Sequence, residues 1–315
     1  MRALVLGGSG AVGRVIVGEL ADRGWSVTSA SRRSSAAAID LGSPAGIREL
    51  ARHAGSHDVV INASGVEDPG IVRAAAPAAY VDISATGRAL AAMREAAVPG
   101  QAVLLGAGLV PGLSTMLVAA LPTQHGDDVD LAVILGTGER HGPAAIEWTA
   151  ALAGQPVFSP PERETVMNLR EWRRLPSQRG PRGYFRADFP DHWLADAGRG
   201  IRVRSYLAAG GALTTAALGL VGRFPRLAPL LARAPHLGTE RWSLVVQNRR
   251  TGARVSAAGV RQSRAAGVLA ALGAEALVRG GVSGVVTMAD TLRLDAVPEL
   301  FSNEKPMREQ CVMSR

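Results

Sequence analysis

Short apolar runs alternate with amphipathic stretches over the first 121 residues of the chain. Residues 3–6 are continuously apolar, which is typical of a strand buried on both faces of a parallel sheet. Val12, Ile16 and Leu20 then recur at every fourth position, and this spacing predicts a helix. Repeated strand–helix units predict an α/β fold with a Rossmann-type, doubly wound parallel sheet. The other strand-like runs of this part are residues 26–30, 59–61, 80–83 and 102–105.

Beyond residue 122 this alternation stops. The segment 155–204 is rich in Pro, Arg and Gly, which indicates mostly irregular structure. An apolar stretch at 206–221 is interrupted by glycines and is too short to cross a membrane, so we interpret it as a buried or amphipathic helix. The other elements that we expect are a strand at 130–135, a helix at 144–153, an antiparallel hairpin of 242–247 and 254–258, and a long helix at about 261–279.

Three glycines follow the first strand at a regular spacing, at positions 7, 10 and 13. Such a turn accepts positive φ, lets the backbone approach a pyrophosphate, and packs the next helix against the strand. The helix N-terminus then offers unpaired N–H groups to the phosphates. The spacing therefore predicts a dinucleotide site. The residues that we expect around the pyrophosphate are Gly7, Ser9, Gly10, Ala11, Val12 and Gly13.

The end of the second strand distinguishes NAD from NADP. NAD sites usually place an acid there to bond the ribose 2′-OH. This chain instead has Ser31, Arg32, Arg33 and Ser34, and no acid lies between Asp22 and Asp40. Guanidinium groups bind phosphate bidentately. We therefore predict NADP(H), with Ser31 and Arg32 or Arg33 at the 2′-phosphate and Asp40 and Leu41 beside the adenine.

Ligands of parallel α/β sheets lie beyond the carboxyl ends of the strands. Residues after the later strands should therefore line the same crevice. Asp82 is open to a second interpretation, as an anion at a helix N-terminus with no ligand role. The residues expected at the crevice are Ala63, Ser64, Gly65, Asp82, Ser84, Gly106 and Gly108.

Composition excludes several chemistries. The 315-residue chain is 47% apolar, enough for a sizeable core, and has one cysteine, Cys311, which excludes a disulfide framework. Its one lysine, Lys305, lies in the tail, so Schiff-base, P-loop and Tyr-x-x-x-Lys chemistry each lack a required residue. No spacing of His, Cys, Asp and Glu resembles a metal site.

The net charge of +8 is concentrated in the middle of the chain. Residues 163–264 hold 19 Arg against 6 acids, a net of +13, which favours an anionic or carrier-bound small molecule as partner. The bland interpretation is that these arginines are only solvated surface charges. With aromatic residues at only 4%, nucleic acid is not expected. No targeting segment is evident, so we expect a cytoplasmic protein without a membrane span.

Candidates for proton transfer lie in a polar loop at 138–142. His141 has the pKa range that suits a general acid, and Glu139 is placed to orient it. His192, beside Asp191, is a second candidate. An exposed loop histidine without a catalytic role is the competing interpretation for His141.

Several motifs together resemble the saccharopine dehydrogenase (saccharopine reductase-like) superfamily. They are the opening glycines, residues 58–62, Tyr80-Val81-Asp82, the run Gly108 to Ser114 with its Pro-Gly-Leu-Ser turn, and residues 281–285 after the long helix. The resemblance covers residues 1–121 and about 240–300. It implies a Rossmann domain formed by 1–121 and about 262–300, interrupted by an α+β substrate and dimerisation domain at 122–261, and a homodimer. From the residues themselves we expect a flexible tail at 303–315.

The resemblance also implies hydride transfer at a C–N bond. Our hypothesis is an NADPH-dependent reductase of an imine or a related unsaturated small molecule, in specialised biosynthesis. Related members of the superfamily reduce C=C bonds, so an enoyl reductase is the first alternative. A non-catalytic NADP-binding sensor is the second, because a fold alone does not determine function.

Overall fold

A computed structural model describes residues 1–139, 148–195, 198–231 and 238–297 of the chain. The described residues divide into two compact units. The first contains Met1–Thr115 and Ser263–Leu292, and the second contains most residues between 116 and 262. The predicted tail at 303–315 lies outside the described residues.

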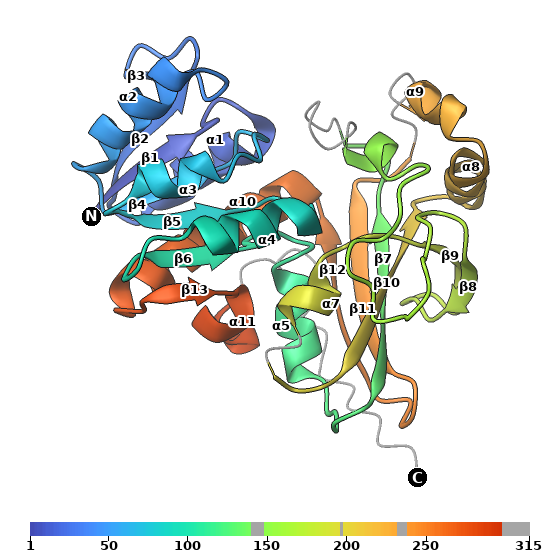
Figure 1. Ribbon diagram of the computed structural model, residues 1–315. Coiled ribbons are helices and arrows are strands. Elements are labelled where there is room, and N and C mark those ends of the chain that lie inside the picture. The colour runs from blue at the N-terminus through green and yellow to red at the C-terminus, as the bar shows by residue number, and fades with distance from the viewer. Residues whose placement is uncertain (140–147, 196–197, 232–237, 298–315) are drawn as a thin grey trace. The chain divides into compact units, whose positions relative to one another are not determined.

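The first unit is built on a seven-stranded sheet in the order β13-β6-β5-β4-β1-β2-β3, with every neighbouring pair parallel (Figure 1). The order places β1 between β4 and β2, so the chain reverses its direction of winding beside β1. The doubly wound fold that the sequence predicts is therefore confirmed. The strands are β1 (Arg2–Leu6), β2 (Ser26–Ser31), β3 (Ala37–Ala38), β4 (Val59–Asn62), β5 (Ala79–Asp82), β6 (Ala102–Leu105) and β13 (Gly284–Val286).

Helices cover both faces of this sheet (Figure 1). Gly267 of α10 lies against Val12 and Val15 of α1, and Gly273 lies against Leu104 of β6, so glycines let these elements approach closely. The central strands β1, β4, β5 and β6 are almost completely buried, as their apolar runs require. The helices are α1 (Ala11–Asp22), α2 (Pro44–Ala54), α3 (Gly70–Ala75), α4 (Gly87–Ala96), α10 (Gln262–Arg279) and α11 (Met288–Thr291). Helix α5 (Leu113–Ala120) leads from this unit into the second.

The second unit is built on a six-stranded mixed sheet in the order β12-β11-β7-β10-β9-β8. The pair β7 and β10 is parallel, and the other neighbours are antiparallel. The hairpin β11–β12 that the sequence predicts is confirmed. The strands are β7 (Asp128–Leu135), β8 (Trp172–Leu175), β9 (Arg182–Arg186), β10 (Arg202–Ala209), β11 (Arg241–Asn248) and β12 (Arg254–Val260). The helices are α7 (Asp191–Leu194), α8 (Ala212–Arg223) and α9 (Ala228–Leu231), with 3-10 turns at Pro225–Leu227 and Leu294–Ala296.

One expectation for this unit is confirmed and one was wrong. The segment 155–204 is mostly irregular, as expected, and it also contains the short elements β8, β9 and α7 and the start of β10. Its strands carry arginines, one of which, Arg186, is fully buried beside Glu162, so an apolar alternation does not reveal them. The stretch 206–221, expected as one helix, is the end of β10 followed by α8, with Gly210 and Gly211 between them.

The described residues were compared with two kinds of feature, a membrane-spanning helix and a metal-binding cluster. No helix among the described residues is long and apolar enough to cross a membrane. Within the same residues, no group of three or more His, Cys, Asp or Glu side chains is placed to hold a metal ion.

Candidate functional site

The glycine turn after β1 is as closely packed as its spacing predicts. Gly7 has a φ of 75° and its N–H donates to the Ala30 carbonyl, while the Gly10 N–H donates to the Gly7 carbonyl at 2.9 Å. A Cβ on Gly13 would meet the Gly7 carbonyl oxygen, and a Cβ on Gly8 would meet the Ser29 hydroxyl. The turn therefore depends on the missing side chains and not only on flexibility.

The N-terminus of α1 is free to bind an anion. Its N-cap is Gly10, no side chain caps the helix, and the first turn holds no acid. The amides of Ala11 and Val12 therefore depend on an external acceptor. Helix α2 differs, because its N-cap Ser43 accepts a hydrogen bond from the Gly46 N–H. The glycine turn after β1 and the N-terminus of α1 together fit a pyrophosphate, which would lie next to the turn.

The end of β2 carries the two arginines that the sequence singles out. Both Arg32 and Arg33 are exposed, in a turn where the Ser34 N–H donates to the Ser31 carbonyl and the Ser34 hydroxyl donates to the Ser29 carbonyl. Among the residues that the structure describes, no acidic side chain pairs with either guanidinium group. The turn thus presents two cations at the place where NAD sites carry an acid.

Asp40 and Leu41 follow β3. Asp40 is exposed, and its carboxylate accepts a hydrogen bond from the Gly42 N–H at 3.2 Å. Leu41 is buried. Both lie in the loop between β3 and α2. This loop follows the edge strand β3, which pairs with β2.

A buried polar network links the ends of β4 and β5. The Asp82 carboxylate is fully buried and accepts hydrogen bonds from the Tyr80 hydroxyl (2.7 Å), the Asn62 amide (2.9 Å) and the Ser84 N–H (2.7 Å). Asn62 in turn accepts from the Ser64 hydroxyl at 2.6 Å. Burial and the nearby Asp82 carboxylate raise the pKa of Tyr80 well above its usual value, so its phenol stays a donor. Asp82 therefore holds both loops at the crevice in place.

The run Gly106 to Ser114 forms a tight loop after β6. The Ala107 N–H donates to the Asp82 carbonyl, and the Leu113 N–H donates to the Gly108 carbonyl at 3.1 Å. A Cβ on Gly112 would meet the Gly108 backbone, so glycine is required there. The structure thus brings the loops after β4, β5 and β6 to one edge of the sheet, as the sequence predicts for parallel strands.

Glu67 lies in the loop between β4 and α3, and sequence inspection did not single it out. Glu67 is exposed as a residue, and neighbouring atoms shield its carboxyl only in part. This desolvation raises the pKa of the carboxyl, a hydrogen bond with Thr86 opposes the shift, and the Asp82 carboxylate adds to it. Thr86 precedes α4 in the loop after β5. The signal that could have found Glu67 is an acid two residues after the Asn-Ala-Ser-Gly run, in the loop that follows β4.

The other candidates for proton transfer lie in the second unit or outside the described residues. Glu139 is partly exposed after β7, and His141 lies outside the described residues. His192 is buried in α7, and its ring nitrogens contact the carbonyl oxygens of Phe158 (2.7 Å) and Phe189 (3.1 Å). Burial lowers the pKa of His192. With both nitrogens occupied by backbone, His192 secures a loop and has no free nitrogen for a substrate.

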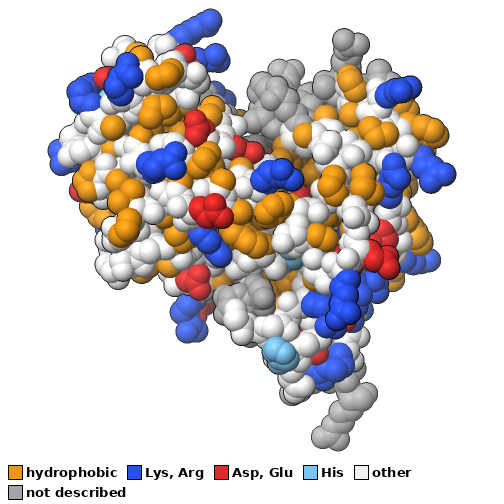
Figure 2. All heavy atoms as spheres, viewed as in Figure 1, with side chains coloured by type: hydrophobic (Ala, Val, Ile, Leu, Met, Phe, Trp, Pro, Cys, Tyr) orange, Lys and Arg blue, Asp and Glu red, His pale blue; other side chains and the backbone are white. Residues whose placement is uncertain are grey.

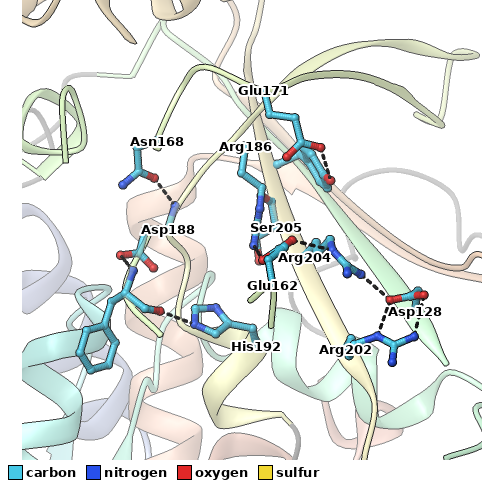
Figure 3. Close-up of polar contacts among 12 residues, drawn as sticks. Asp128, Glu162, Asn168, Glu171, Arg186, Asp188, His192, Arg202, Arg204 and Ser205 are labelled. Atoms are coloured by element: carbon cyan, nitrogen blue, oxygen red, sulfur yellow. Dashed lines mark hydrogen bonds and ion pairs between the residues drawn. The ribbon is translucent and has the colours of Figure 1, made fainter. Parts of the chain in front are cut away.

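The second sheet carries a chain of ion pairs (Figure 3). Fully buried Arg186 contacts Glu162 at 3.2 Å and donates to the Ser205 carbonyl. Glu162 also accepts from Arg204 at 2.6 Å, and Arg204 pairs with Asp128. Neighbouring guanidinium groups hold the pKa of Glu162 and of Asp128 below their usual values. Each of these charged side chains is paired with an opposite charge, so we interpret the chain of ion pairs as stabilising the second unit.

The arginines between 170 and 186 are also largely committed to the fold. Arg182 donates to the Ala209 carbonyl at 2.8 Å, Arg170 donates to the Gly222 carbonyl, and Arg173 lies 3.8 Å from Asp130. These three guanidinium groups therefore bind groups of their own unit and are not the purely solvated surface charges of the second interpretation.

Comparison with known proteins supports the assignment of the first unit. Residues 3–123 match the model of the NAD dependent epimerase/dehydratase family, a span that covers less than half of the chain and ends before the first strand of the second sheet. A search of curated protein sequences gave no match. The match and the glycine turn agree that the first unit is a Rossmann domain for a nicotinamide dinucleotide.

Solved structures give only distant similarities. An engineered D-amino acid dehydrogenase bound to NADP+ is 16% identical over 97% of both chains, with a TM-score of 0.46. A probable aspartate-semialdehyde dehydrogenase from Pseudomonas aeruginosa is 16% identical over 79% of this chain and 74% of its own, with a TM-score of 0.34. TM-scores below 0.5 assign neither residues nor substrate to this chain. Its own topology and glycine turn identify it as a Rossmann protein of the NAD(P)-dependent type.

Proposed function

We propose that the protein is an NADP(H)-dependent reductase that acts on a C=N bond of a small molecule. One observation carries the choice of cofactor: the end of β2 presents Arg32 and Arg33, and no acid among the described residues neutralises them. The uncapped N-terminus of α1 and the glycine cradle supply the pyrophosphate site. Preference for an imine rests on the resemblance to saccharopine reductase-like proteins.

When bound, NADPH supplies the hydride, and the protein contributes binding, orientation and, where needed, a proton. The amides of α1 would hold the diphosphate, and the guanidinium groups after β2 would hold the ribose phosphate. The network of Asp82, Asn62 and Tyr80 fixes the loops after β4 and β5, next to the crevice. An iminium ion needs no proton donor, whereas a neutral imine needs one at nitrogen.

For that donor we propose Glu67. Its loop lies at the carboxyl ends of β4 and β5, where the nicotinamide half of a dinucleotide is expected. Glu67 is exposed as a residue, while partial desolvation of its carboxyl and the nearby Asp82 carboxylate both favour the protonated form. No Tyr-x-x-x-Lys sequence exists in the chain, so a tyrosine–lysine pair cannot do this work. Glu139 and His141 remain the alternative donors.

Calorimetry with NADPH and NADH tests the cofactor, and oxidation of NADPH in the presence of cyclic imines, enones and keto acids tests the chemistry. We expect NADPH to bind about 10-fold to 100-fold more tightly than NADH, since a charge-assisted hydrogen bond contributes about 1.5–3 kcal/mol. Equal affinities would reject the NADP assignment. Turnover of enones but not imines would favour the C=C alternative, and binding without any turnover would favour the sensor.

Glu67→Gln tests the proton donor. A donor must be protonated, so the wild-type rate should fall as pH rises through the raised pKa of Glu67. The amide variant should keep the NADPH affinity, lose about 10²-fold or more in kcat with a neutral imine, and lack that limb of the pH profile. The matched control is Asp68→Asn in the same loop, whose carboxylate accepts from the Gly70 N–H. An unchanged profile in Glu67→Gln would assign the proton elsewhere.

A further inference from the structure

Helix α8 exposes large apolar side chains on its outer face. Leu213 is 88% exposed, Leu220 52% and Phe224, directly after the helix, 55%. Their spacing of seven and four residues places them on one stripe of the helix. The inner face already packs on the second sheet, with Leu218 and Val221 buried. The helix is thus apolar on both sides, and nothing within its own packing explains the outer stripe.

The inner packing keeps α8 fixed in this orientation. A Cβ on Gly219 would meet the ring of Phe185 in β9, and a Cβ on Gly222 would meet Leu169. Arg170 donates to the Gly222 carbonyl at 3.3 Å, and Arg182 donates to Thr215 near the start of the helix. The helix therefore cannot roll to bury Leu213 or Leu220 without losing these contacts.

Positive charge borders the stripe. Arg223 and Arg226 are exposed beside Phe224, and no acid occurs between Asp196 and Glu240. Trp172, 58% exposed, is paired in register with Phe185, on the face of the sheet that α8 covers. Figure 2 shows hydrophobic and basic side chains next to one another over the part of the second unit that carries α8 and α9. We call Leu213, Leu220, Phe224, Arg223 and Arg226 the α8 patch.

We propose that the α8 patch binds the surface of an anionic phospholipid bilayer, with Leu213, Leu220 and Phe224 inserted at the level of the acyl-chain boundary and the two arginines at the headgroups. An apolar helix face bordered by basic residues is the arrangement that lies in a membrane interface. Aromatic side chains and arginine are suited to the same depth.

A lipid surface fits the patch better than a protein does. Leu213 stands almost completely clear of its neighbours, as insertion into a bilayer requires, whereas a docking peptide needs a recess. A second copy of the chain would bring arginines of like charge to the same interface. An anionic headgroup layer instead neutralises them, with about 1 kcal/mol expected for each basic residue near the surface. The proposal does not depend on the proposed enzymatic function.

Vesicle co-sedimentation of the full chain tests the proposal. We expect binding to vesicles of phosphatidylcholine mixed with phosphatidylglycerol, weaker binding to phosphatidylcholine alone, and loss of binding at high salt. The double variant Leu220→Ser/Phe224→Ser should lower the partition coefficient at least about tenfold. Arg223→Gln/Arg226→Gln should abolish the preference for anionic vesicles.

The matched control is Val98→Ser, which removes an exposed apolar side chain of the first unit and should leave vesicle binding unchanged. Circular dichroism and NADPH binding should be unaltered in all variants, because surface substitutions usually change stability little. Light scattering reports the oligomeric state. Absence of vesicle binding by the wild type, or equal binding by the Leu220→Ser/Phe224→Ser variant, overturns the proposal. A change from dimer to monomer without lipid binding also overturns it and assigns the patch to self-association.

Discussion

The two sheets of this protein are stabilised in different ways. Strands β1, β4 and β6 of the first sheet are apolar along most of their length, and its buried polar groups, Asn62 and Asp82, sit at the carboxyl ends of strands. The second sheet carries charges within its strands, including fully buried Arg186. In the first sheet the buried polar groups are confined to the carboxyl ends of β4 and β5, the edge where we expect a ligand. In the second they neutralise one another across the strands, as Arg186, Glu162 and Arg204 do in Figure 3.

This difference has a consequence for function. The buried polar groups at the ends of β4 and β5 are satisfied by hydrogen bonds, and they hold loops at the edge where ligands of parallel sheets are expected. A charge within a sheet must be paired, because an unpaired buried ion destabilises a protein strongly. The polar groups at the strand ends of the first sheet therefore indicate a binding site. The paired charges within the second sheet indicate a structural network.

The largest effect is expected in the glycine turn. Gly13→Val would push a side chain into the Gly7 carbonyl, so we expect NADPH affinity to fall at least about 100-fold and the free energy of unfolding to fall by about 3 kcal/mol. Calorimetry and urea unfolding measure both quantities. Gly18→Ala is the control in the same helix, since a Cβ at that position would have no atom within 4 Å and helix propensity should raise stability by about 0.5–1 kcal/mol.

The next effect is expected in the buried part of the second sheet. Arg186→Met leaves Glu162 with one partner fewer, and we expect the free energy of unfolding to fall by about 3 kcal/mol. Arg202→Met, at the exposed end of the same chain of ion pairs, should cost less than about 1 kcal/mol. Equal losses in urea unfolding would contradict the distinction between buried and exposed members. NADPH affinity should not change in either variant.

A smaller effect is expected at the end of β2. Replacing both arginines, Arg32→Gln/Arg33→Gln, should weaken NADPH binding by about 2 kcal/mol and leave NADH binding and the unfolding midpoint unchanged, because both side chains are exposed. Arg48→Gln, an exposed arginine of α2, is the control. If NADPH and NADH lose affinity equally, the two arginines do not contact the 2′-phosphate.

The smallest effect is expected from mild acid. Arg250 and the Gln124 N–H lower the pKa of Asp127, and Arg202 and Arg204 lower that of Asp128. A carboxyl whose folded pKa is lowered stabilises the fold fully above its unfolded pKa of about 3.9, and the contribution disappears as pH falls through the folded value. The second unit should therefore lose stability below about pH 4.

Tryptophan fluorescence can follow this loss by unit. Trp25 is buried in the first unit, whereas Trp242 is buried in the second. The variant Trp25→Phe thus reports only the second unit during acid titration. Asp128→Asn should flatten the pH dependence in that variant. An unchanged dependence would show that other carboxyls control acid stability.

Most of the first unit could be predicted because its signals are local. Apolar runs determine buried strands, and glycine spacing determines the turn, so β1, β6 and the start of α1 follow from neighbouring residues. Asp82 shows the limit of this reasoning. Its sequence position suggests a ligand contact as readily as a structural role, and only the hydrogen bonds from Tyr80, Asn62 and Ser84 distinguish them.

The second unit was less predictable because its strands do not follow a simple apolar pattern. Trp172–Leu175 and Arg182–Arg186 are rich in arginine, and residues far away in the chain supply the acids that pair with them. His192 looked like a candidate acid beside Asp191, yet both of its ring nitrogens contact backbone carbonyls. Glu67 was overlooked since the partial desolvation of its carboxyl and the approach of Asp82 are properties of the folded loops.

By itself the sequence determined the dinucleotide turn and the absence of an acid after the second strand, because both depend on residues within one βα unit. It also excluded lysine-dependent chemistry, since the chain has one lysine. Tertiary structure decided which charges are paired, which histidine is occupied and which apolar side chains of α8 stay exposed. Those properties depend on contacts between distant segments, and the order of residues does not specify such contacts until the chain folds.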